Sequence, residues 1–321
     1  MVNSTPGIRL FAELAPLGFG CCPMGGHGWG QVNNEELKEA VVVALDLGVR
    51  LFDTSDIYGL GTSETLLGQA LRSRRSEAFI ATKFGVRREN GVTFHDTSPA
   101  WIIAAAEASL RRLNTECIDL YQMHYWDGVT PPGEVISALD SLQKAGKIRA
   151  YGVTNHDPRI SHATPSGGRV ATYSYQYNLV HREHEDLIRA IQQNSDLLFM
   201  SWGSLGQGAL SGSYKSIAQL PTGDRRNRNV YANFHGDKFS AVQQVMNELR
   251  SVAEENGIPS MTQLALRWIV DSIPRALPLV GIKRPEQIID AAGILRFKLD
   301  LATCKRIDLL TQQFKSSFLF V

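Results

Sequence analysis

The sequence of 321 residues predicts an α/β protein, a (β/α)8 barrel with its active site at the carboxyl ends of the strands. Short apolar runs of β-prone residues alternate with longer stretches of helical pattern along the chain. This alternation favours parallel strands joined by right-handed crossovers. About eight such units over this length favour a closed barrel over an open sheet. No linker rich in proline and serine divides the chain, so we expect a single domain over residues 1–321.

The expected strands are short runs in which hydrophobic residues predominate. Several are continuous rather than alternating, which is typical of strands covered on both faces. The expected ranges are 17–21, 51–53, 79–83, 118–124, 150–153, 172–176, 198–202 and 276–280.

The helices between the strands begin and end at residues typical of helix termini. Asn33 and Glu36 have the spacing of a capping box, and Gly48 follows the same helix where a terminal glycine is common. Further expected helix starts are Ser98-Pro99, Pro132-Gly133 and Pro285, and a further expected end is Gly146.

One long segment, 203–236, is rich in glycine and lacks a regular pattern. A segment of this length is either a functional lid, here a clasp over a cofactor, or disordered. A short C-terminal tail is expected at 315–321.

Composition excludes several classes of function. A net charge of +1 gives no reason to expect a nucleic acid or an anionic membrane as partner. No apolar run approaches the roughly 18 residues of a membrane helix, and no leader-peptide pattern opens the chain. The four cysteines form no Cys-x-x-Cys pair and no zinc-type cluster with histidine. We therefore expect a cytoplasmic protein without a metal site.

Polar residues stand where three consecutive strands end. The second strand ends in Asp53, with Tyr58 in the loop that follows; the third ends in Lys83 and the fourth in His124. Taken singly, an aspartate can cap a helix, a lysine can be a solvated charge, and a histidine can be a core residue. Together these groups face one mouth of the barrel, where active sites of this fold lie.

These four groups are suited to donating a proton. A tyrosine hydroxyl has a pKa near 10, and a neighbouring ammonium lowers it. We expect Lys83, held charged by Asp53, to play that part, and His124 to orient a carbonyl or relay the proton. Such a site protonates a developing alkoxide. Because no side chain supplies a hydride, a nicotinamide cofactor is implied.

The cofactor is not expected on a Rossmann domain, because no Gly-x-Gly-x-x-Gly follows the first strand and opens a helix. Small residues at 201–212 would admit a ligand close to the backbone, and Trp202 offers a flat face for nicotinamide; a plug for the barrel is the alternative. Lys283 and Arg284 precede a helix amino terminus, which favours the second phosphate of NADP(H). The alternative is a solvated pair of cations.

These features together resemble the aldo-keto reductase superfamily over nearly the whole chain. The segments that carry the resemblance are "LFDTSDIYG" with "SETLLGQAL" (51–71), "IATKFG" (80–85), "CIDLYQMHYWD" (117–127), "GKIRAYGVTN" (146–155) and "GIKRPEQI" (281–288).

The resemblance implies a (β/α)8 barrel that binds NADP(H) and reduces a carbonyl. It implies Tyr58 as the acid, Lys83 and Asp53 as the pair that tunes it, and His124 as the group that orients the carbonyl. The cofactor contacts that it implies are Asp53, Gly20 and Cys21 at the mouth; Thr154, Asn155 and Gln176 on the carboxamide; Trp202 on the nicotinamide; Gly203, Leu205, Gly206 and Gly208 along the pyrophosphate; and Gly281, Lys283, Arg284 and Gln287 at the adenosine end.

Three positions depart from the family pattern. Gly203-Ser204-Leu205 replaces a common Ser-Pro-Leu, and Ser213 and Ala291 replace a lysine and an asparagine that would contact the cofactor. Our hypothesis is that an arginine of the long loop compensates; the candidates are Arg225, Arg226 and Arg228.

The predicted function is NADPH-dependent reduction of an aldehyde or ketone. One alternative is a regulatory subunit that binds NADP(H) with little turnover, resembling potassium-channel β subunits, although these tend to lack a histidine in the place of His124. A second is an aldolase or lyase that uses Lys83 as a Schiff base. Aromatic residues in or near the mouth loops, Trp29, Phe84 and Trp126, favour a ring or apolar carbonyl substrate.

Overall fold

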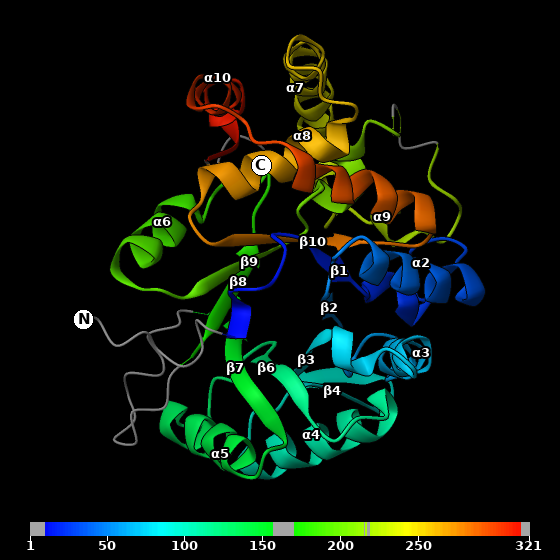
Figure 1. Cartoon of the computed structure of the whole chain (residues 1–321), viewed down its shortest axis with the longest axis vertical. Helices are drawn as coiled ribbons and strands as arrows, with labels where there is room; N and C mark the ends of the chain where they lie inside the picture. The colour runs from blue at the N-terminus through cyan, green and yellow to red at the C-terminus, as the bar shows by residue number, and fades with distance from the viewer. Residues whose placement is uncertain (1–9, 157–169, 215, 217–218, 316–321) are drawn as a thin grey trace.

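The computed structural model describes residues 10–156, 170–214, 216 and 219–315. Within these residues eight parallel strands close into a barrel in the order β1-β10-β9-β8-β7-β6-β3-β2, with helices around them (Figure 1). The (β/α)8 prediction is confirmed. The strands are β1 (Gly18–Gly20), β2 (Leu51–Asp53), β3 (Phe79–Phe84), β6 (Ile118–Met123), β7 (Ile148–Thr154), β8 (Thr172–Gln176), β9 (Leu198–Trp202) and β10 (Ala276–Gly281).

The expected helix starts are also confirmed. The Asn33 side chain accepts a hydrogen bond from the Glu35 amide at 2.9 Å, and the Ser98 hydroxyl accepts one from the Trp101 amide at 3.4 Å. The helices are α2 (Asn34–Asp46), α3 (Thr62–Leu71), α4 (Pro99–Leu113), α5 (Pro132–Lys144), α6 (Glu185–Asn194), α7 (Gly236–Glu255), α8 (Met261–Ser272), α9 (Pro285–Ala292) and α10 (Leu301–Thr311). Among the described helices, none combines the length and apolarity needed to cross a membrane.

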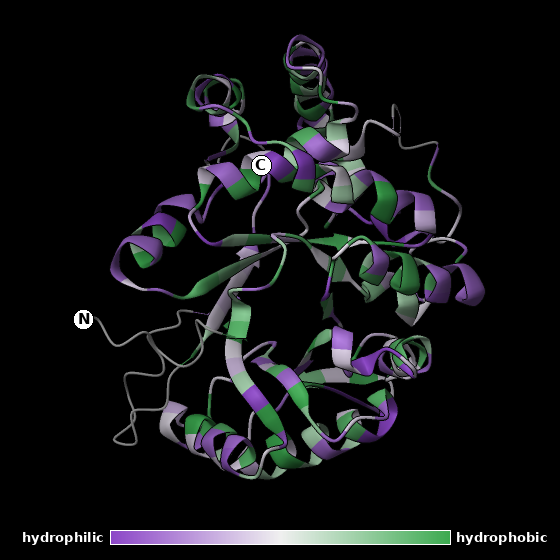
Figure 2. Ribbon diagram, viewed as in Figure 1, coloured by the Kyte–Doolittle hydropathy of each residue, from purple (hydrophilic) through white to green (hydrophobic). Residues whose placement is uncertain are grey.

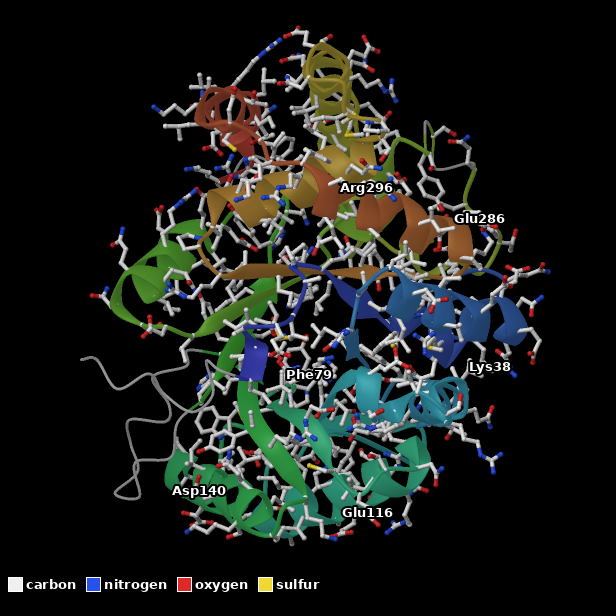
Figure 3. The ribbon with its side chains drawn as sticks, viewed as in Figure 1. Lys38, Phe79, Glu116, Asp140, Glu286 and Arg296 are labelled. Atoms are coloured by element: carbon white, nitrogen blue, oxygen red, sulfur yellow. The ribbon has the colours of Figure 1, made fainter. Side chains whose placement is uncertain are left out.

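Alternate residues of the strands fill the inside of the barrel. Leu51, Ala81, Leu120 and Leu277 belong to one buried cluster, together with Phe79, which lies near the centre of the molecule in Figure 3. In the same view the charged residues Lys38 and Glu116 lie toward the outer edge. Since side chains alternate along a strand, the inward positions two residues beyond Leu51, Ala81 and Leu120 are occupied by polar residues. These residues are Asp53, Lys83 and Gln122.

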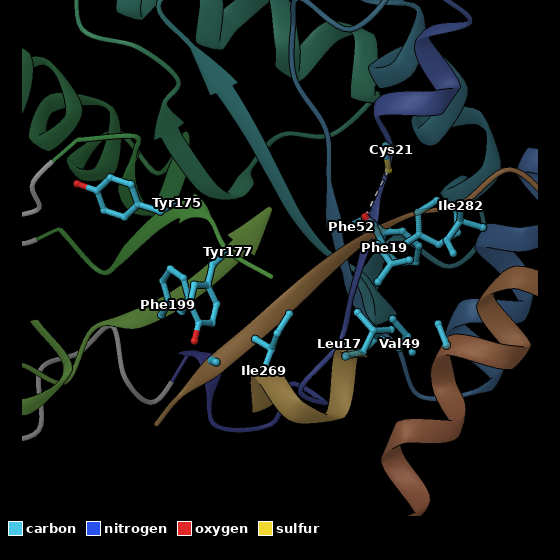
Figure 4. Packing of buried hydrophobic residues seen from close by; sticks show 14 of the residues in the cluster. Leu17, Phe19, Cys21, Val49, Phe52, Tyr175, Tyr177, Phe199, Ile269 and Ile282 are labelled. Atoms are coloured by element: carbon cyan, nitrogen blue, oxygen red, sulfur yellow. Dashed lines mark hydrogen bonds between the residues drawn. The ribbon is translucent and has the colours of Figure 1, made fainter. Parts of the chain in front are cut away.

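The residues between these positions face the helices and form the larger core. Figure 4 shows Phe19 and Phe52, from β1 and β2, packed beside Ile282. The helices alternate hydrophobic and hydrophilic segments, as expected when one side of each helix packs on the strands (Figure 2). Phe84 belongs to this core and is fully buried. The expectation that Phe84 shapes the pocket is therefore wrong, because its neighbour Lys83 takes the inward position.

A β-hairpin is present at residues 86–95, where none of the expected strands lies. β4 (Val86–Glu89) and β5 (Val92–His95) pair antiparallel outside the barrel. Asn90 and Gly91 form the turn, both with positive φ (49° and 82°), which is the signature of a tight hairpin turn. The hairpin lies directly after β3 and carries His95 toward the active-site mouth.

The long segment 203–236 is built from short 3-10 turns in its described part. These turns are Gly206–Ser211, Arg225–Asn227 and Ala232–Phe234. The Arg226 guanidinium binds both carboxylate oxygens of Asp224, at 2.9 and 2.7 Å, and donates to the Gln207 carbonyl at 3.1 Å. We expected this segment to be either a functional lid or disordered. Disorder does not describe these residues, because they form defined turns and hydrogen bonds. The expected tail lies outside the described residues from position 316 on.

Candidate active site

The polar residues at the ends of β2 and β3 form one buried ion pair. Lys83 lies two residues beyond Ala81 and therefore points inward, as Asp53 does beyond Leu51. The Lys83 Nζ lies 2.8 and 2.7 Å from the two carboxylate oxygens of Asp53, and it also donates to the Thr54 carbonyl at 2.8 Å. Both side chains are almost fully buried. The predicted pairing of these two residues is thus present in the structure.

Tyr58 lies against this pair. The Lys83 Nζ is 5.1 Å from the centre of the Tyr58 ring, and the His124 ring meets the Tyr58 ring edge-on at 6.0 Å. The turn that carries Tyr58 is held by a close backbone contact, since a Cβ on Gly25 would lie 2.7 Å from the Gly59 nitrogen. Only glycine allows this approach. The structure therefore brings the four predicted catalytic residues together.

The direction of the Tyr58 pKa differs from our expectation. Burial raises the pKa of Tyr58 well above its usual range, and Asp53 acts in the same direction. We had expected Lys83 to lower it. The physical reason is first the burial of the phenol, which disfavours its anion, and then the negative charge of the Asp53 carboxylate that is paired with Lys83. The hydroxyl consequently holds its proton at neutral pH, which is the state that a proton donor needs.

His124 is held as a neutral ring. It lies one residue past β6, and its amide donates to the Phe84 carbonyl at 2.8 Å. Burial, Lys83 and His95 together lower the pKa of His124 well below its usual value. The ring stacks on Tyr125 with centres 5.1 Å apart, and Tyr125 stacks on His95 at 5.1 Å. A neutral imidazole has a single N–H, so its tautomer decides what it can donate to.

Two residues near this cluster were not among the predicted site residues. The Gln122 amide lies 3.4 Å from an Asp53 oxygen, and the Ser55 hydroxyl lies 3.4 Å from the His124 Nδ1. Gln122 lies on β6, two residues beyond the inward-facing Leu120, so the alternation of β-strand side chains could have identified it. Ser55 lies in the loop after β2, where no such periodicity applies.

The ends of β7, β8 and β9 form the neighbouring part of the mouth. The Trp202 indole donates to the Asn155 side chain at 3.0 Å, and Gln176 is the strand partner of Trp202. The Thr154 hydroxyl receives a hydrogen bond from Ser174 at 2.9 Å. The residues that the resemblance placed on a carboxamide and a nicotinamide thus lie side by side.

The glycines of the loop after β9 have backbone conformations that favour this residue. Gly203, Gly206 and Gly208 all have positive φ, and Leu205 lies between them. Across the mouth, a Cβ on Gly20 would lie 3.0 Å from the Val280 carbonyl, and Cys21 follows it fully buried. Gly20 therefore permits the close contact between β1 and β10, and the positive φ values account for the three glycines after β9.

The end of β10 carries the predicted cationic group. Lys283 donates its ammonium to the Trp29 carbonyl, and its amide donates to the Gln287 side chain at 2.8 Å. Burial, Arg226 and Arg284 all lower the pKa of Lys283, while Asp224 opposes them. Arg284 is the residue before α9, and Gly281 closes β10. Arg226 and Lys283 thus act on the same carboxylate, that of Asp224, and Arg284 adds a further positive charge near Lys283. An anion would stabilise this excess of positive charge.

Two surface hollows lie elsewhere in the described chain. They have volumes of about 390 and 290 Å³, lie against α8 and α9, and share Gln263 and Arg296. None of the predicted site residues lines them. In the part of the chain that is described, no group of three or more potential ligands could hold a metal ion.

Comparison with known proteins gives consistent matches. The Aldo/keto reductase family profile matches residues 16–312. The chain is 33% identical to the aldo-keto reductase yakc [NADP(+)] of Schizosaccharomyces pombe, covering 95% of this chain and 91% of that protein. It is 30% identical to the solved glycerol dehydrogenase AKR11B4 of Gluconobacter oxydans, with a TM-score of 0.85 over 94% of this chain and 92% of the other. A Klebsiella pneumoniae aldo-keto reductase solved with NADPH is 27% identical, with a TM-score of 0.71 and 94% coverage of each chain.

Proposed function

The chain belongs to the aldo/keto reductase family, and from this premise we propose that it reduces an aldehyde or ketone to an alcohol with NADPH. The observation that carries the proposal is the position of the Lys83 ammonium, between the Asp53 carboxylate and the Tyr58 ring. In this proposal Tyr58 donates the proton and His124 orients the carbonyl oxygen. The NADPH, when bound, supplies the hydride.

Each of the four polar side chains has a separate role in the proposed reaction. The half-buried Tyr58 side chain holds its hydroxyl proton until negative charge develops on the substrate oxygen, and then donates it. The phenolate left behind lies beside the Lys83 ammonium, which limits the cost of forming a partly buried anion. Asp53 fixes the position of Lys83 through both carboxylate oxygens. A neutral His124 can donate one hydrogen bond to the carbonyl without competing as an acid.

NADP(H) is the cofactor that fits this chain. The yakc relative carries NADP(+) in its name, and a structural neighbour was solved with NADPH. We assign the nicotinamide end to Trp202 and Asn155, and the phosphate of the adenosine ribose to Lys283 and Arg284. The Arg226 guanidinium binds Asp224 and the loop backbone. We therefore expect Arg226 to support the cofactor indirectly, through the shape of segment 203–236.

A panel of carbonyl compounds and alcohols tests the proposal. We expect the purified protein to oxidise NADPH with at least one aldehyde or ketone, measured by the loss of nicotinamide absorbance. The panel should include short polyols and their oxidation products, because one structural neighbour is a glycerol dehydrogenase. Tight NADPH binding with no turnover across the panel would favour the regulatory alternative. A substrate trapped on Lys83 by borohydride would favour the Schiff-base alternative, which the charged pairing with Asp53 opposes.

Replacing Lys283 by methionine tests the cofactor assignment. A charge-assisted hydrogen bond to phosphate contributes roughly 1.5–3 kcal/mol, so Lys283→Met should weaken NADPH binding by about tenfold or more. NADH lacks the second phosphate, and its affinity should change much less. Fluorescence titration of both cofactors gives the two ratios. Equal losses for NADPH and NADH would remove Lys283 from the phosphate site.

A further inference from the structure

The hydroxyl of Ser55 lies between a carboxylate, that of Asp56, and an imidazole, that of His124, at the edge of the active site. It lies 3.0 Å from an Asp56 carboxylate oxygen and 3.4 Å from the His124 Nδ1, and the Ile57 amide donates to it at 3.4 Å. Ser55 is fully buried. A hydroxyl has one proton to donate and two lone pairs to accept with. It can therefore donate to Asp56 or to His124, but not to both.

We propose that Ser55 and Asp56 are positioning residues that determine which nitrogen of the His124 imidazole carries its proton. This inference rests on the proposed function, in which His124 orients the substrate oxygen. When Asp56 is ionised, Ser55 donates to it and accepts the Nδ1 proton of His124, so Nε2 is a bare acceptor. When Asp56 is protonated, Asp56 donates to Ser55, Ser55 donates to Nδ1, and the histidine proton is on Nε2.

The two arrangements differ by one proton taken from solvent. A proton added at Nε2 and passed through Nδ1 and the Ser55 oxygen to the carboxylate converts the first arrangement into the second. In both states every donor and acceptor position of the Ser55 hydroxyl is filled, including the bond from the Ile57 amide. The stacking of Tyr125 on His124 holds the plane of the ring. The proton can thus move while the ring stays in place.

The surroundings of Asp56 favour this change near neutral pH. Burial and Glu64 raise the pKa of Asp56 to about 7, while the hydrogen bonds from Ser55 and the Ile57 amide, and then the charge of Arg112, act in the opposite direction. Glu64, on α3, is itself paired with Arg112, on α4. The ionisable groups that face His124 are Lys83 from β3, His95 from β5, Tyr58 and Tyr125. Below pH 7, then, His124 presents an N–H to a carbonyl, and above it a lone pair to an alcohol.

Nitrogen NMR of the free protein tests the inference directly. The shifts of the two imidazole nitrogens identify the protonated one, so we expect the His124 proton to move from Nε2 to Nδ1 as pH rises from about 5 to about 8. In Asp56→Ala the serine has no competing acceptor, and the proton should stay on Nε2 throughout. A parent ring that keeps one tautomer, or a transition that persists in Asp56→Ala, would overturn the proposal.

Kinetics give the second readout. In the parent, kcat/KM for carbonyl reduction, divided by that of Asp56→Ala, should fall about five-fold as the pH rises through 7. A factor of this size corresponds to the loss of one neutral hydrogen bond to the carbonyl. His95→Phe is the matched control, because it keeps an aromatic ring on Tyr125 and removes the other titratable ring; the transition should remain. If Asp56→Ala does not fold, Ser55→Ala should also lose the transition. The NMR needs no substrate, so an absence of any turnover would refute the proposed function and leave the tautomer result standing.

Discussion

Replacing Tyr58 by phenylalanine will remove most of the carbonyl reduction and leave cofactor binding intact. General acid catalysis contributes up to about ten-thousandfold in rate, and we expect kcat to fall by roughly a thousandfold. The phenylalanine ring can keep the contacts of the half-buried tyrosine ring with Lys83 and His124. NADPH affinity should therefore remain within about threefold of the parent value, since the hydroxyl has no assigned contact with the cofactor.

Two measurements on Tyr58→Phe separate cofactor binding from the chemical step. Fluorescence titration with NADPH reports binding, and single-turnover oxidation of bound NADPH reports the chemical step without the influence of product release. His95→Phe is a suitable control at the same mouth, because it removes a ring nitrogen outside the proposed proton path to the substrate. Near-normal reduction by Tyr58→Phe for several aldehydes would refute the role of Tyr58 as the acid.

The barrel could be predicted because its strands and helices are indicated by residues that are neighbours in the sequence. Several strands are continuous apolar runs, and helices such as α2 and α4 begin at a recognisable cap, Asn33 and Ser98. The hairpin after β3 was missed although Asn90-Gly91 is a strong turn signal. Its strands are mostly exposed, and the alternation of Val92 and Phe94 with polar residues covers only four residues, so the turn was the stronger signal.

The site could be predicted in position but only partly in its electrostatics. Strand ends identified Asp53, Lys83 and His124, because parallel strands gather their carboxyl ends at one mouth. The direction of the Tyr58 pKa depends on how deeply the phenol is buried and on its position relative to the charge of Asp53. Both are three-dimensional quantities. The same is true of Ser55, whose role depends on a separation of 3.4 Å from a residue 69 positions away.

The ion pair of Asp53 and Lys83 should also have a large effect on stability, apart from its proposed role in catalysis. Removing one partner of a buried pair leaves an uncompensated charge and costs roughly 3–5 kcal/mol of the free energy of unfolding. We expect losses of this size for both Asp53→Asn and Lys83→Met. The double variant should lose less free energy of unfolding than the two single variants lose together, by at least about 2 kcal/mol. The reason is that neither charge then remains buried without its partner.

Urea denaturation of the four proteins measures this coupling as a double-mutant cycle. Gln122→Ala is the control, since it removes a neutral neighbour of Asp53 at 3.4 Å and leaves the ion pair in place. All three charge variants should reduce carbonyls poorly. In Lys83→Met and in the double variant the Tyr58 phenolate lacks its ammonium, and in Asp53→Asn the ammonium is no longer held in place by the carboxylate. Additive stability losses would mean that the two charges are solvated independently. Recovery of activity in the double variant would mean that Lys83 serves only the fold.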